Sequence, residues 1–383
     1  MKKVILAPDS FKGSLSAVQL CMIMEEEIHQ IFKTCDIISI PIADGGEGTV
    51  DAFLHALGGV RVQETVSGPF HETIPSFYGW LPTLDTAVIE MAAAAGLSLA
   101  AGREDPSQAT TYGVGQLMRR AVEAGAKRLL IGLGGSCTND GGCGLAAALG
   151  VRFYDKNGQA FLPVGRTLSQ IARIDTGEAR AFLSNVTITA MCDVENPLSG
   201  PQGAAYVFAP QKGADRDMVR LLDEGLTHYG ALLEKMPGGS GVSTLPGAGA
   251  AGGLGAGLHA LLGASLTPGI DVILDTVSFD QLLDHCDLVI TGEGKMDGQS
   301  LRGKAAIGIA RRARTKRVPV CAFVGDVMDQ QLTDALQNGL TAVFSIHRQT
   351  LPLKQAIART ESDLRAALSN LMRLIQALSS GSA

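Results

Sequence analysis

Residues 2–57 read KKVILAPDSFKGSLSAVQLCMIMEEEIHQIFKTCDIISIPIADGGEGTVDAFLHAL. In order, the pattern predicts a strand, a helix, a second strand and a second helix, at about residues 2–7, 16–33, 36–42 and 48–57. Ser16 followed by Gln19 has the spacing of a capping box at a helix start. Two β-loop-α units in succession are typical of a parallel, doubly wound sheet.

The same alternation returns near the C-terminus. It predicts strands and helices in turn at about residues 287–291, 303–315, 318–324, 328–338, 341–345 and 353–379. The middle of the chain differs, because residues 60–91 form short strand patterns broken by Gly, Pro and aromatic residues. Further elements of the middle are predicted at about residues 111–124, 127–133, 141–149, 186–192, 215–235 and 252–264.

The length of 383 residues exceeds the roughly 250–300 at which a single core stops growing. We therefore expect two α/β domains. Residues 1–63 and 283–383 are predicted to form one parallel-sheet domain from both chain ends, and residues 64–282 an inserted mixed α/β domain. Pro268-Gly269 is the expected crossing near the second boundary.

Composition argues against several classes of protein. A net charge of −6 and a pI near 5.7 argue against nucleic-acid binding, which requires clustered Lys and Arg. The basic run at residues 311–317 falls at the end of a predicted helix, where cations complement the helix dipole. No stretch approaches the roughly 18 apolar residues of a membrane span, and the strand at 2–7 leaves no room for a signal peptide.

The cysteines and histidines point to a reducing compartment and away from zinc. Seven scattered cysteines include no C-x-x-C pair, as expected in the cytoplasm rather than in a disulfide framework. The seven histidines include no H-E-x-x-H motif. We expect a cytoplasmic protein, a monomer or homodimer, with small-molecule substrates.

In open parallel sheets, ligands bind beyond the carboxyl ends of the strands. The loops predicted there are rich in Asp, Gly and Lys, at residues 8–14, 43–49, 292–304 and 325–326. Asp and Gly also make ordinary turns, so any one loop alone could be structural. Four such loops at one sheet edge indicate an active site instead.

Phosphoryl transfer needs this set of groups. Backbone N–H groups of glycines hold phosphate oxygens, Lys or Arg offsets transition-state charge, and carboxylates hold Mg²⁺. One further carboxylate accepts the proton of the acceptor hydroxyl.

The predicted inserted domain adds three segments of similar character. Residues 132–144 lie between a strand and a helix, where amides can face an anion, although small residues there also suit a tight turn. Residues 192–197, CDVENP, place acidic groups at a strand end. Residues 247–253 open a helix, and phosphate binding and close packing remain equally open for them.

Two motif matches are rejected. Gly247, Gly249 and Gly252 satisfy G-x-G-x-x-G, but residues 241–246 make a poor buried strand, which a dinucleotide site requires. Residues 298–304 match G-x-x-x-x-G-K, but Ala305 stands where a P-loop has the Ser or Thr that binds Mg²⁺.

Taken together, these segments resemble the bacterial-type glycerate kinase family. The resemblance is carried by six blocks in the family's order: APDSFKGSLSA at 7–17, PIADGGEGTVDA at 41–52, GLGGSCTNDGGCGLAAALG at 132–150, CDVENPLSGPQGAAYVFAPQKGA at 192–214, PGAGAAGGLGAGL at 246–258 and VITGEGKMDGQSLRGKA at 289–305. They run through almost the whole chain.

The resemblance implies a flavodoxin-like domain from both termini, an inserted mixed α/β domain and a site in the cleft between them. It also implies ATP-dependent phosphorylation of D-glycerate, with 2-phosphoglycerate favoured over 3-phosphoglycerate. Two departures stand out: Gly298 lacks a hydroxyl that is usual in the family, and Gly325-Asp326 is atypical, which leaves a role for Asp326 open.

Placement at strand ends selects the candidate residues. The expected catalytic residues are Asp44, Asp193 and Lys12, with one aspartate as base and the other on the Mg²⁺ side. The expected substrate-binding residues are Ser10, Asp9, Arg302 and Asn139. Those expected to bind the nucleotide and its phosphates are Gly134, Gly135, Ser136, Thr138, Gly292, Gly294, Lys295 and Lys304. The expected metal ligands are Asp297 and Glu47, and the expected cofactors are ATP and Mg²⁺.

Other functions stay open at this point. A nicotinamide-dependent oxidoreductase would share the sheet and the glycines at 247–252, and would bind NAD(H). A non-catalytic sugar-acid sensor would bind glycerate without consuming ATP. A kinase for another small hydroxy acid would share all the predicted chemistry.

Overall fold

The computed structural model describes residues 1–296 and 305–380, which form two compact units. The terminal unit comprises Met1–Ala43, Asp51–Gly58 and Ile270–Ala383, and the central unit comprises Asp44–Val50 and Gly59–Gly269. The predicted fold class is confirmed: both chain ends build a parallel α/β unit, and the middle builds a mixed α/β unit.

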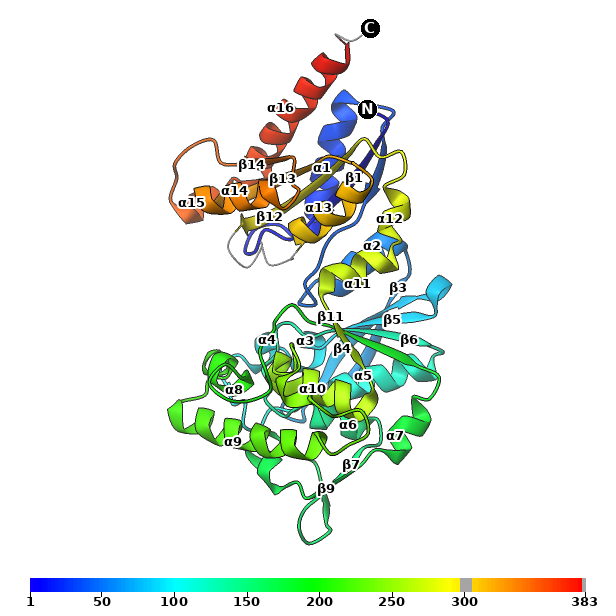
Figure 1. Cartoon of the computed structure of the whole chain (residues 1–383), viewed down its shortest axis with the longest axis vertical. Coiled ribbons are helices and arrows are strands. Elements are labelled where there is room, and N and C mark those ends of the chain that lie inside the picture. The colour runs from blue at the N-terminus through cyan, green and yellow to red at the C-terminus, as the bar shows by residue number, and fades with distance from the viewer. Residues whose placement is uncertain (297–304, 381–383) are drawn as a thin grey trace. The chain divides into compact units, whose positions relative to one another are not determined.

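The terminal unit contains a five-stranded parallel sheet (Figure 1). Its strands are β1 (Lys3–Pro8), β2 (Asp36–Ser39), β12 (Leu288–Met296), β13 (Val320–Val327) and β14 (Ala342–Ser345). The spatial order β2-β1-β12-β13-β14 is the 2-1-3-4-5 order of flavodoxin-like folds. The strand order therefore reverses between β1 and β12, which is where such sheets bind ligands.

Eight of the described helices belong wholly or largely to this unit. They are α1 (Ala17–Ile31), α2 (Thr49–Leu57), α11 (Gly269–Thr276), α12 (Phe279–Leu282), α13 (Ala305–Thr315), α14 (Asp329–Gln337), α15 (Leu353–Ala358) and α16 (Thr360–Ser380). Of these, α1, α13 and α14 contact the strands of the sheet. The predicted capping box is present, because Ser16 Oγ accepts from Gln19 N and Gln19 Oε1 accepts from Ser16 N. The predicted single closing helix is wrong: Arg359, with φ −104° and ψ −1°, ends α15, and α16 starts at the next residue.

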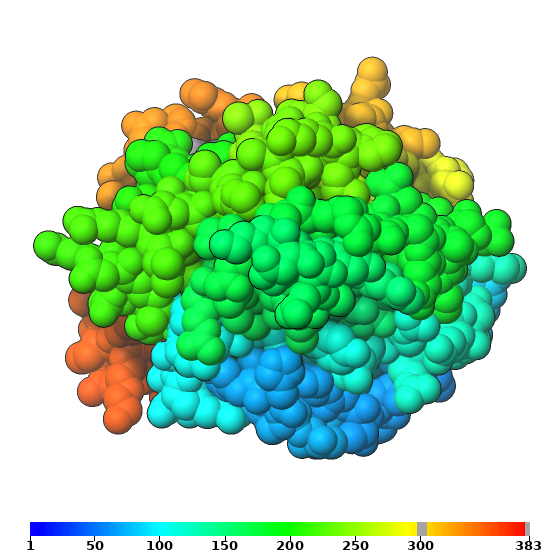
Figure 2. Space-filling view, turned by 90° about the horizontal axis from the view of Figure 1, so that it is seen from below, coloured from blue at the N-terminus to red at the C-terminus, as the bar shows by residue number. Residues whose placement is uncertain are grey.

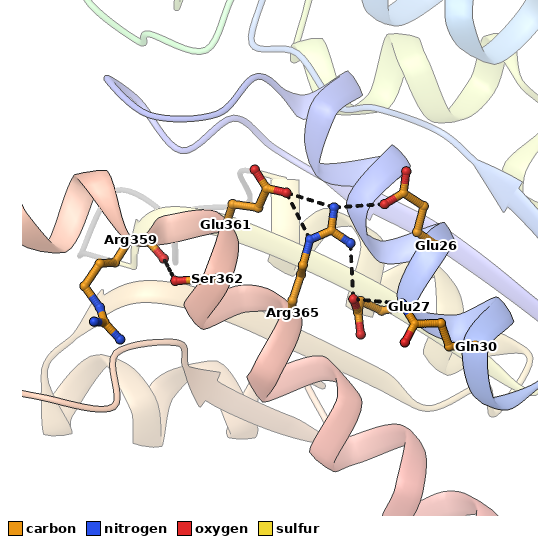
Figure 3. Close-up of polar contacts among 7 residues, drawn as sticks. All are labelled: Glu26, Glu27, Gln30, Arg359, Glu361, Ser362 and Arg365. Atoms are coloured by element: carbon orange, nitrogen blue, oxygen red, sulfur yellow. Dashed lines mark hydrogen bonds and ion pairs between the residues drawn. The ribbon is translucent and has the colours of Figure 1, made fainter.

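Helices α1 and α16 lie side by side and share a core with β1 and β12 (Figure 1). At their contact, Arg365 of α16 pairs with Glu26 and Glu27 of α1 and with Glu361 of its own helix (Figure 3). The side chain of Arg365 is 29% exposed and that of Glu27 only 10%. This cluster, which we call the Arg365 cluster, ties the last helix to the first.

The central unit contains a six-stranded sheet in the order β11-β10-β6-β5-β4-β3. Its strands are β3 (Val60–Ser67), β4 (Thr73–Leu81), β5 (Thr86–Glu90), β6 (Arg128–Gly132), β10 (Thr187–Met191) and β11 (Ser265–Thr267). Neighbours from β5 to β11 are parallel, and β3 and β4 add an antiparallel edge. The carboxyl ends of β5, β6 and β10 therefore lie next to one another.

This unit also contains a three-stranded antiparallel sheet that the sequence pattern did not predict. It consists of β7 (Arg152–Tyr154), β8 (Ala160–Phe161) and β9 (Arg173–Asp175). Strands of two or three residues are too short for a recognisable alternation of apolar and polar side chains.

The helices of the central unit are α3 (Ala92–Ala95), α4 (Leu97–Ala100), α5 (Tyr112–Glu123), α6 (Cys143–Ala148), α7 (Gly177–Phe182), α8 (Ala204–Phe208), α9 (Arg216–Leu233) and α10 (Ala250–Leu262). Much of the core is formed by the small and aliphatic side chains of α5, α6 and α10. Seen from the end that carries α9 and β9, the outer surface is formed largely by segments coloured cyan to light green (Figure 2). None of the described helices has the length and apolar character needed to cross a membrane.

Candidate active site

In the terminal unit, the loop after β1 lies against the end of β12. The backbone N–H of Asp9 donates to the carbonyl oxygen of Gly292 (2.8 Å), and the N–H of Ser10 donates to Asp9 Oδ1 (2.6 Å). A Cβ placed on Gly294 would lie 3.3 Å from the backbone N of Lys12. The structure therefore brings Asp9, Ser10 and Lys12 together with Gly292 and Gly294 at the point where the strand order reverses.

Close backbone approach explains the glycines in this group. A Cβ on Gly292 would lie 2.7 Å from the carbonyl oxygen of Phe323, and one on Gly325 would lie 2.4 Å from that of Gly294. The side chains of Lys12 and Lys295 are exposed at the same strand ends. Asp297, Arg302 and Lys304 lie outside the described residues.

In the central unit, β5, β6 and β10 end side by side. Their last residues, Glu90, Gly132 and Met191, pair with one another across the sheet. The segment 44–50 crosses this row. A Cβ on Gly132 would lie 2.2 Å from the carbonyl oxygen of Gly45, and one on Gly45 would lie 2.9 Å from that of Met191. Neither position has room for a side chain, so two glycines set how closely the segment approaches the sheet.

Two hydrogen bonds fix the rest of this segment. Glu90 is 4% exposed, and its Oε1 accepts from the backbone N–H of Val50 at 2.7 Å. The hydroxyl of Thr49, which is fully buried, donates to the carbonyl oxygen of Gly46 at 2.7 Å. The buried Glu90 carboxylate thus anchors one end of segment 44–50, and Gly45 anchors the other.

This packing places two of the predicted catalytic carboxylates at one strand end. Asp44 directly precedes Gly45, and Asp193 follows Met191, the residue that Gly45 contacts. Asp44 is exposed, with Oδ1 accepting from Gly46 N at 3.0 Å, and Asp193 is half-buried, with Oδ1 accepting from Gly269 N at 2.8 Å. Glu47 is exposed on the same segment.

The Gly-rich loop after β6 has an outer and a buried part. The backbone N–H of Gly134 donates to Gly45 O (3.0 Å), and Gly135 is exposed, so these residues lie beside the segment that carries Asp44. By contrast, Ser136 is 7% exposed, and Thr138 and Asn139 are fully buried. Within the described residues, neither polar atom of the Asn139 side chain has a hydrogen-bond partner.

Comparison with known proteins identifies the family. The model of the glycerate kinase family matches residues 4–376. The chain belongs to the glycerate kinase family. A glycerate kinase of Bacillus subtilis (strain 168) is 43% identical over 374 residues, which cover 96% of this chain and 97% of that protein. A glycerate 2-kinase of Escherichia coli (strain K12) is 40% identical, covering 97% and 99%.

A solved structure agrees with the sequence relatives. A protein assigned as glycerate kinase 2 of Salmonella typhimurium LT2 superimposes with a TM-score of 0.87 at 39% identity, over 99% of each chain. The family resemblance, the fold class and the enzyme class predicted from the sequence are thereby confirmed: this member of the glycerate kinase family is a phosphotransferase.

The structure also shows two buried carboxylates near the strand ends, and sequence reasoning missed the first of them, Glu90. Glu90 is the only charged residue of the buried strand β5. A charged residue at the end of a buried strand is the feature of the sequence that could have identified it. Asp140 is fully buried, and Oδ2 accepts from the backbone N–H and hydroxyl of Thr111 and from Gly144 N. Burial raises the pKa of the Asp140 carboxyl, while these donors act in the opposite direction.

The glycines at 247–252 do not form a dinucleotide site in this glycerate kinase family member. Residues Val242–Thr244 form a 3-10 helix rather than the required strand. A Cβ on Gly252 would lie 2.1 Å from the carbonyl oxygen of Thr138, so this glycine permits close packing against the Gly-rich loop. Of the two uses left open for residues 247–253, the geometry at Gly252 supports packing. The P-loop match at 298–304 lies outside the described residues.

Proposed function

We propose that the protein transfers the γ-phosphoryl group of ATP to D-glycerate and releases 2-phosphoglycerate. The observation that carries the proposal is the placement of Asp44 and Asp193 at one strand end, set by the contacts of Gly45 with Gly132 and Met191. Transfer to the 2-hydroxyl is favoured because the similar Escherichia coli protein is a glycerate 2-kinase.

Two carboxylates at one strand end can divide the work of phosphoryl transfer. One accepts the proton of the glycerate hydroxyl, a contribution of about 10²–10⁴-fold in rate. The other, with Glu47, would hold Mg²⁺. Asp44 and Glu47 are exposed and Asp193 is half-buried, so each is within reach of a ligand from solvent.

The carboxylates of the central unit suit an Mg²⁺ ion that is bound partly by the protein and partly by the substrate phosphates. Within residues 1–296 and 305–380, no group of three or more His, Cys, Asp or Glu could hold a metal alone. Mg²⁺ in kinases is bound by one or two carboxylates together with substrate phosphates and water, so a partial set of protein ligands is what such a site requires. When bound, the ion neutralises charge on the transferred phosphoryl group.

The remaining predicted residues supply donors and positive charge. The exposed Gly135 can offer its backbone N–H to a phosphate oxygen, and Gly134, whose own N–H donates to Gly45 O, holds the loop beside segment 44–50. In the terminal unit, exposed Lys12 and Lys295 offset phosphate charge, and Asp9 and Ser10 contact glycerate. Roles for Asp297, Arg302, Lys304, Ser136, Thr138 and Asn139 stay predictions.

We also propose that the protein works in the cytoplasm, as a monomer or homodimer. All seven cysteines are free, which supports a reducing compartment.

An ADP-release assay with ATP and D-glycerate tests the function, followed by phosphorus NMR of the product. We expect ADP release that depends on D-glycerate and on Mg²⁺, with 2-phosphoglycerate as the product. D-lactate, which has the same configuration at C2 and lacks only the 3-hydroxyl, is the matched control for other hydroxy acids. ADP release that is independent of glycerate, or faster with another hydroxy acid, would overturn the substrate assignment, and 3-phosphoglycerate would overturn the choice of hydroxyl.

A further inference from the structure

A buried lysine contacts the Gly-rich loop from its inner side. Lys212 is 2% exposed, and its Nζ donates to Ser136 Oγ (2.7 Å) and to the carbonyl oxygen of Thr138 (2.7 Å). It reaches the loop from the short 3-10 helix Pro210–Lys212, which is remote from the loop in sequence. Lys212 therefore joins two residues of the loop and holds their relative position.

The charge of this lysine has no carboxylate partner. Both of its acceptors are neutral oxygen atoms, and within the described part of the chain Lys212 forms no ion pair. Burial of an ammonium group without a counter-ion costs free energy. In agreement with that cost, burial lowers the pKa of Lys212 to about 8. A neutral donor could make the same two hydrogen bonds at a lower cost in free energy. The charge of Lys212 therefore indicates a function beyond these hydrogen bonds.

The charge acts on the outer side of the loop in two ways. Because Ser136 Oγ accepts from the ammonium, its own hydrogen can point only away from Lys212. In addition, a positive charge in a low-dielectric interior attracts an anion more strongly than one in water does. Gly135, the neighbour of Ser136, is exposed, so this side of the loop faces solvent.

We infer that Lys212 is a positioning residue for ATP: its ammonium orients the Ser136 hydroxyl and adds positive charge behind the loop that receives the phosphates. Lys212 does this without touching the nucleotide. The inference rests on the proposed role of residues 134–138 in phosphate binding.

Two other ionisable groups near Lys212, Cys137 and Glu104, keep the same charge state around pH 8. Burial raises the pKa of Cys137 to about 12, so its thiol is neutral. Asp140 is held by several hydrogen-bond donors and acts on Lys212 at longer range. Glu104, whose backbone lies against Gly213, is exposed and has a pKa lowered by backbone N–H donors, so it stays ionised. Of Cys137, Glu104 and Lys212, Lys212 is the one with a pKa near 8.

Lys212→Met and Lys212→Gln separate charge from hydrogen bonding. We expect Lys212→Met to raise the KM for ATP about tenfold or more, while kcat and the KM for glycerate stay within about threefold. Lys212→Gln, which can still donate, should give a smaller rise. Lys156→Met, a change of an exposed lysine in the same unit, is the control and should change neither KM. In a Ser136→Ala background, Lys212→Met should have a clearly smaller effect.

The pH profile gives a readout that a purely structural role would not affect. As pH rises through about 8, Lys212 loses its proton and its charge. The wild-type kcat/KM for ATP should therefore fall above this pH, because this parameter reports the free enzyme. The fall should be absent in Lys212→Met and in Lys212→Gln.

Calorimetric titration with ATP separates the failure of this inference from the failure of the proposed function. If the wild type binds ATP and Lys212→Met binds it within twofold as tightly, or if the variants keep the wild-type pH profile, the inference is wrong and the proposed function stands. If the wild type binds ATP without phosphorylating glycerate, the proposed function fails, and ATP affinity still decides the role of Lys212. Should Lys212→Met fail to fold, Lys212→Gln and the wild-type profile decide the question.

Discussion

At the scale of single residues, segment 44–50 and the strand ends of the central unit are in close backbone contact. No side chain would fit between them at Gly45 or Gly132. The carbonyl oxygen of Gly45 occupies the position that a Cβ on Gly132 would need. The proposed catalytic carboxylates Asp44 and Asp193, on either side of this contact, depend for their position on residues that carry no functional group. The contribution of such glycines is spatial, since it sets where Asp44 lies.

Gly132→Ala tests this spatial role. The added Cβ would lie 2.2 Å from Gly45 O, so segment 44–50 must move away from the sheet. We expect kcat for glycerate phosphorylation to fall about 10–100-fold, because displacement of reacting groups by about 1 Å is costly. Gly177→Ala, at an exposed site whose Cβ would meet only the side chain of Asp175, is the control. Wild-type turnover by a folded Gly132→Ala protein would contradict the account.

Glu90 offers a second test at this scale. Its carboxylate accepts from Val50 N at 2.7 Å in a buried position. Glu90→Leu leaves that N–H unpaired, which should lower the free energy of unfolding by about 1–3 kcal/mol and reduce kcat. Glu90→Gln keeps an acceptor and should retain most of both. Urea unfolding and steady-state rates measure the two effects, and equal behaviour of the two variants would show that the acceptor is unimportant.

Among elements, the contact between the first and last helices depends on charge as well as on apolar packing. Arg365 of α16 reaches three carboxylates, two of them on α1 (Figure 3). Glu27 is nearly buried, so the loss of its partner leaves a poorly solvated charge.

Arg365→Met should therefore lower the free energy of unfolding by about 1–2 kcal/mol, more than an isolated surface pair contributes. Arg220→Met is the matched control, because the Arg220–Asp217 pair on α9 is almost fully solvated. We expect that control to change stability by less than about 0.5 kcal/mol. Urea unfolding measures both variants, and KM values should stay unchanged. A similar loss in both would mean that the Arg365 cluster adds nothing specific.

Most long elements of the fold could be predicted from the sequence because each carries its own signal. The capping box at Ser16, the buried strands at both chain ends and the long α9 follow from local pattern. The break at Arg359 and the short strands β7, β8 and β9 could not be predicted, because tertiary contacts rather than local preference decide them.

The same limit applies to the candidate site. The positions of Asp44 and Asp193 in strand-end loops made them candidates. The hydrogen bonds of Glu90 with Val50 and of Lys212 with Ser136 could not be predicted from the sequence. These partners are distant along the chain and meet only in the folded unit. The burial of Thr138 and Asn139 could not be predicted either, because polar residues in a Gly-rich loop are expected to be exposed to solvent.

For the whole molecule, the fold gathers distant segments into a parallel-sheet unit and a mixed α/β unit. In the terminal unit, β1 from one chain end pairs with β12 from the other. In the central unit, segment 44–50 contacts Glu90, Gly132 and Met191, the last residues of three strands, which follow it by 40 residues or more. We propose that phosphoryl transfer depends on Asp44 and Asp193 at the strand ends of the central unit.

The turnover of Asp44→Asn and of Asp193→Asn with saturating ATP and D-glycerate tests this claim most directly. Asparagine keeps the size of each side chain and can still accept a hydrogen bond from Gly46 or Gly269, so circular dichroism should show folded proteins. The account predicts that kcat falls about 10²–10⁴-fold in the variant that lacks the base and clearly in the other. Near-wild-type kcat in both folded variants would contradict it.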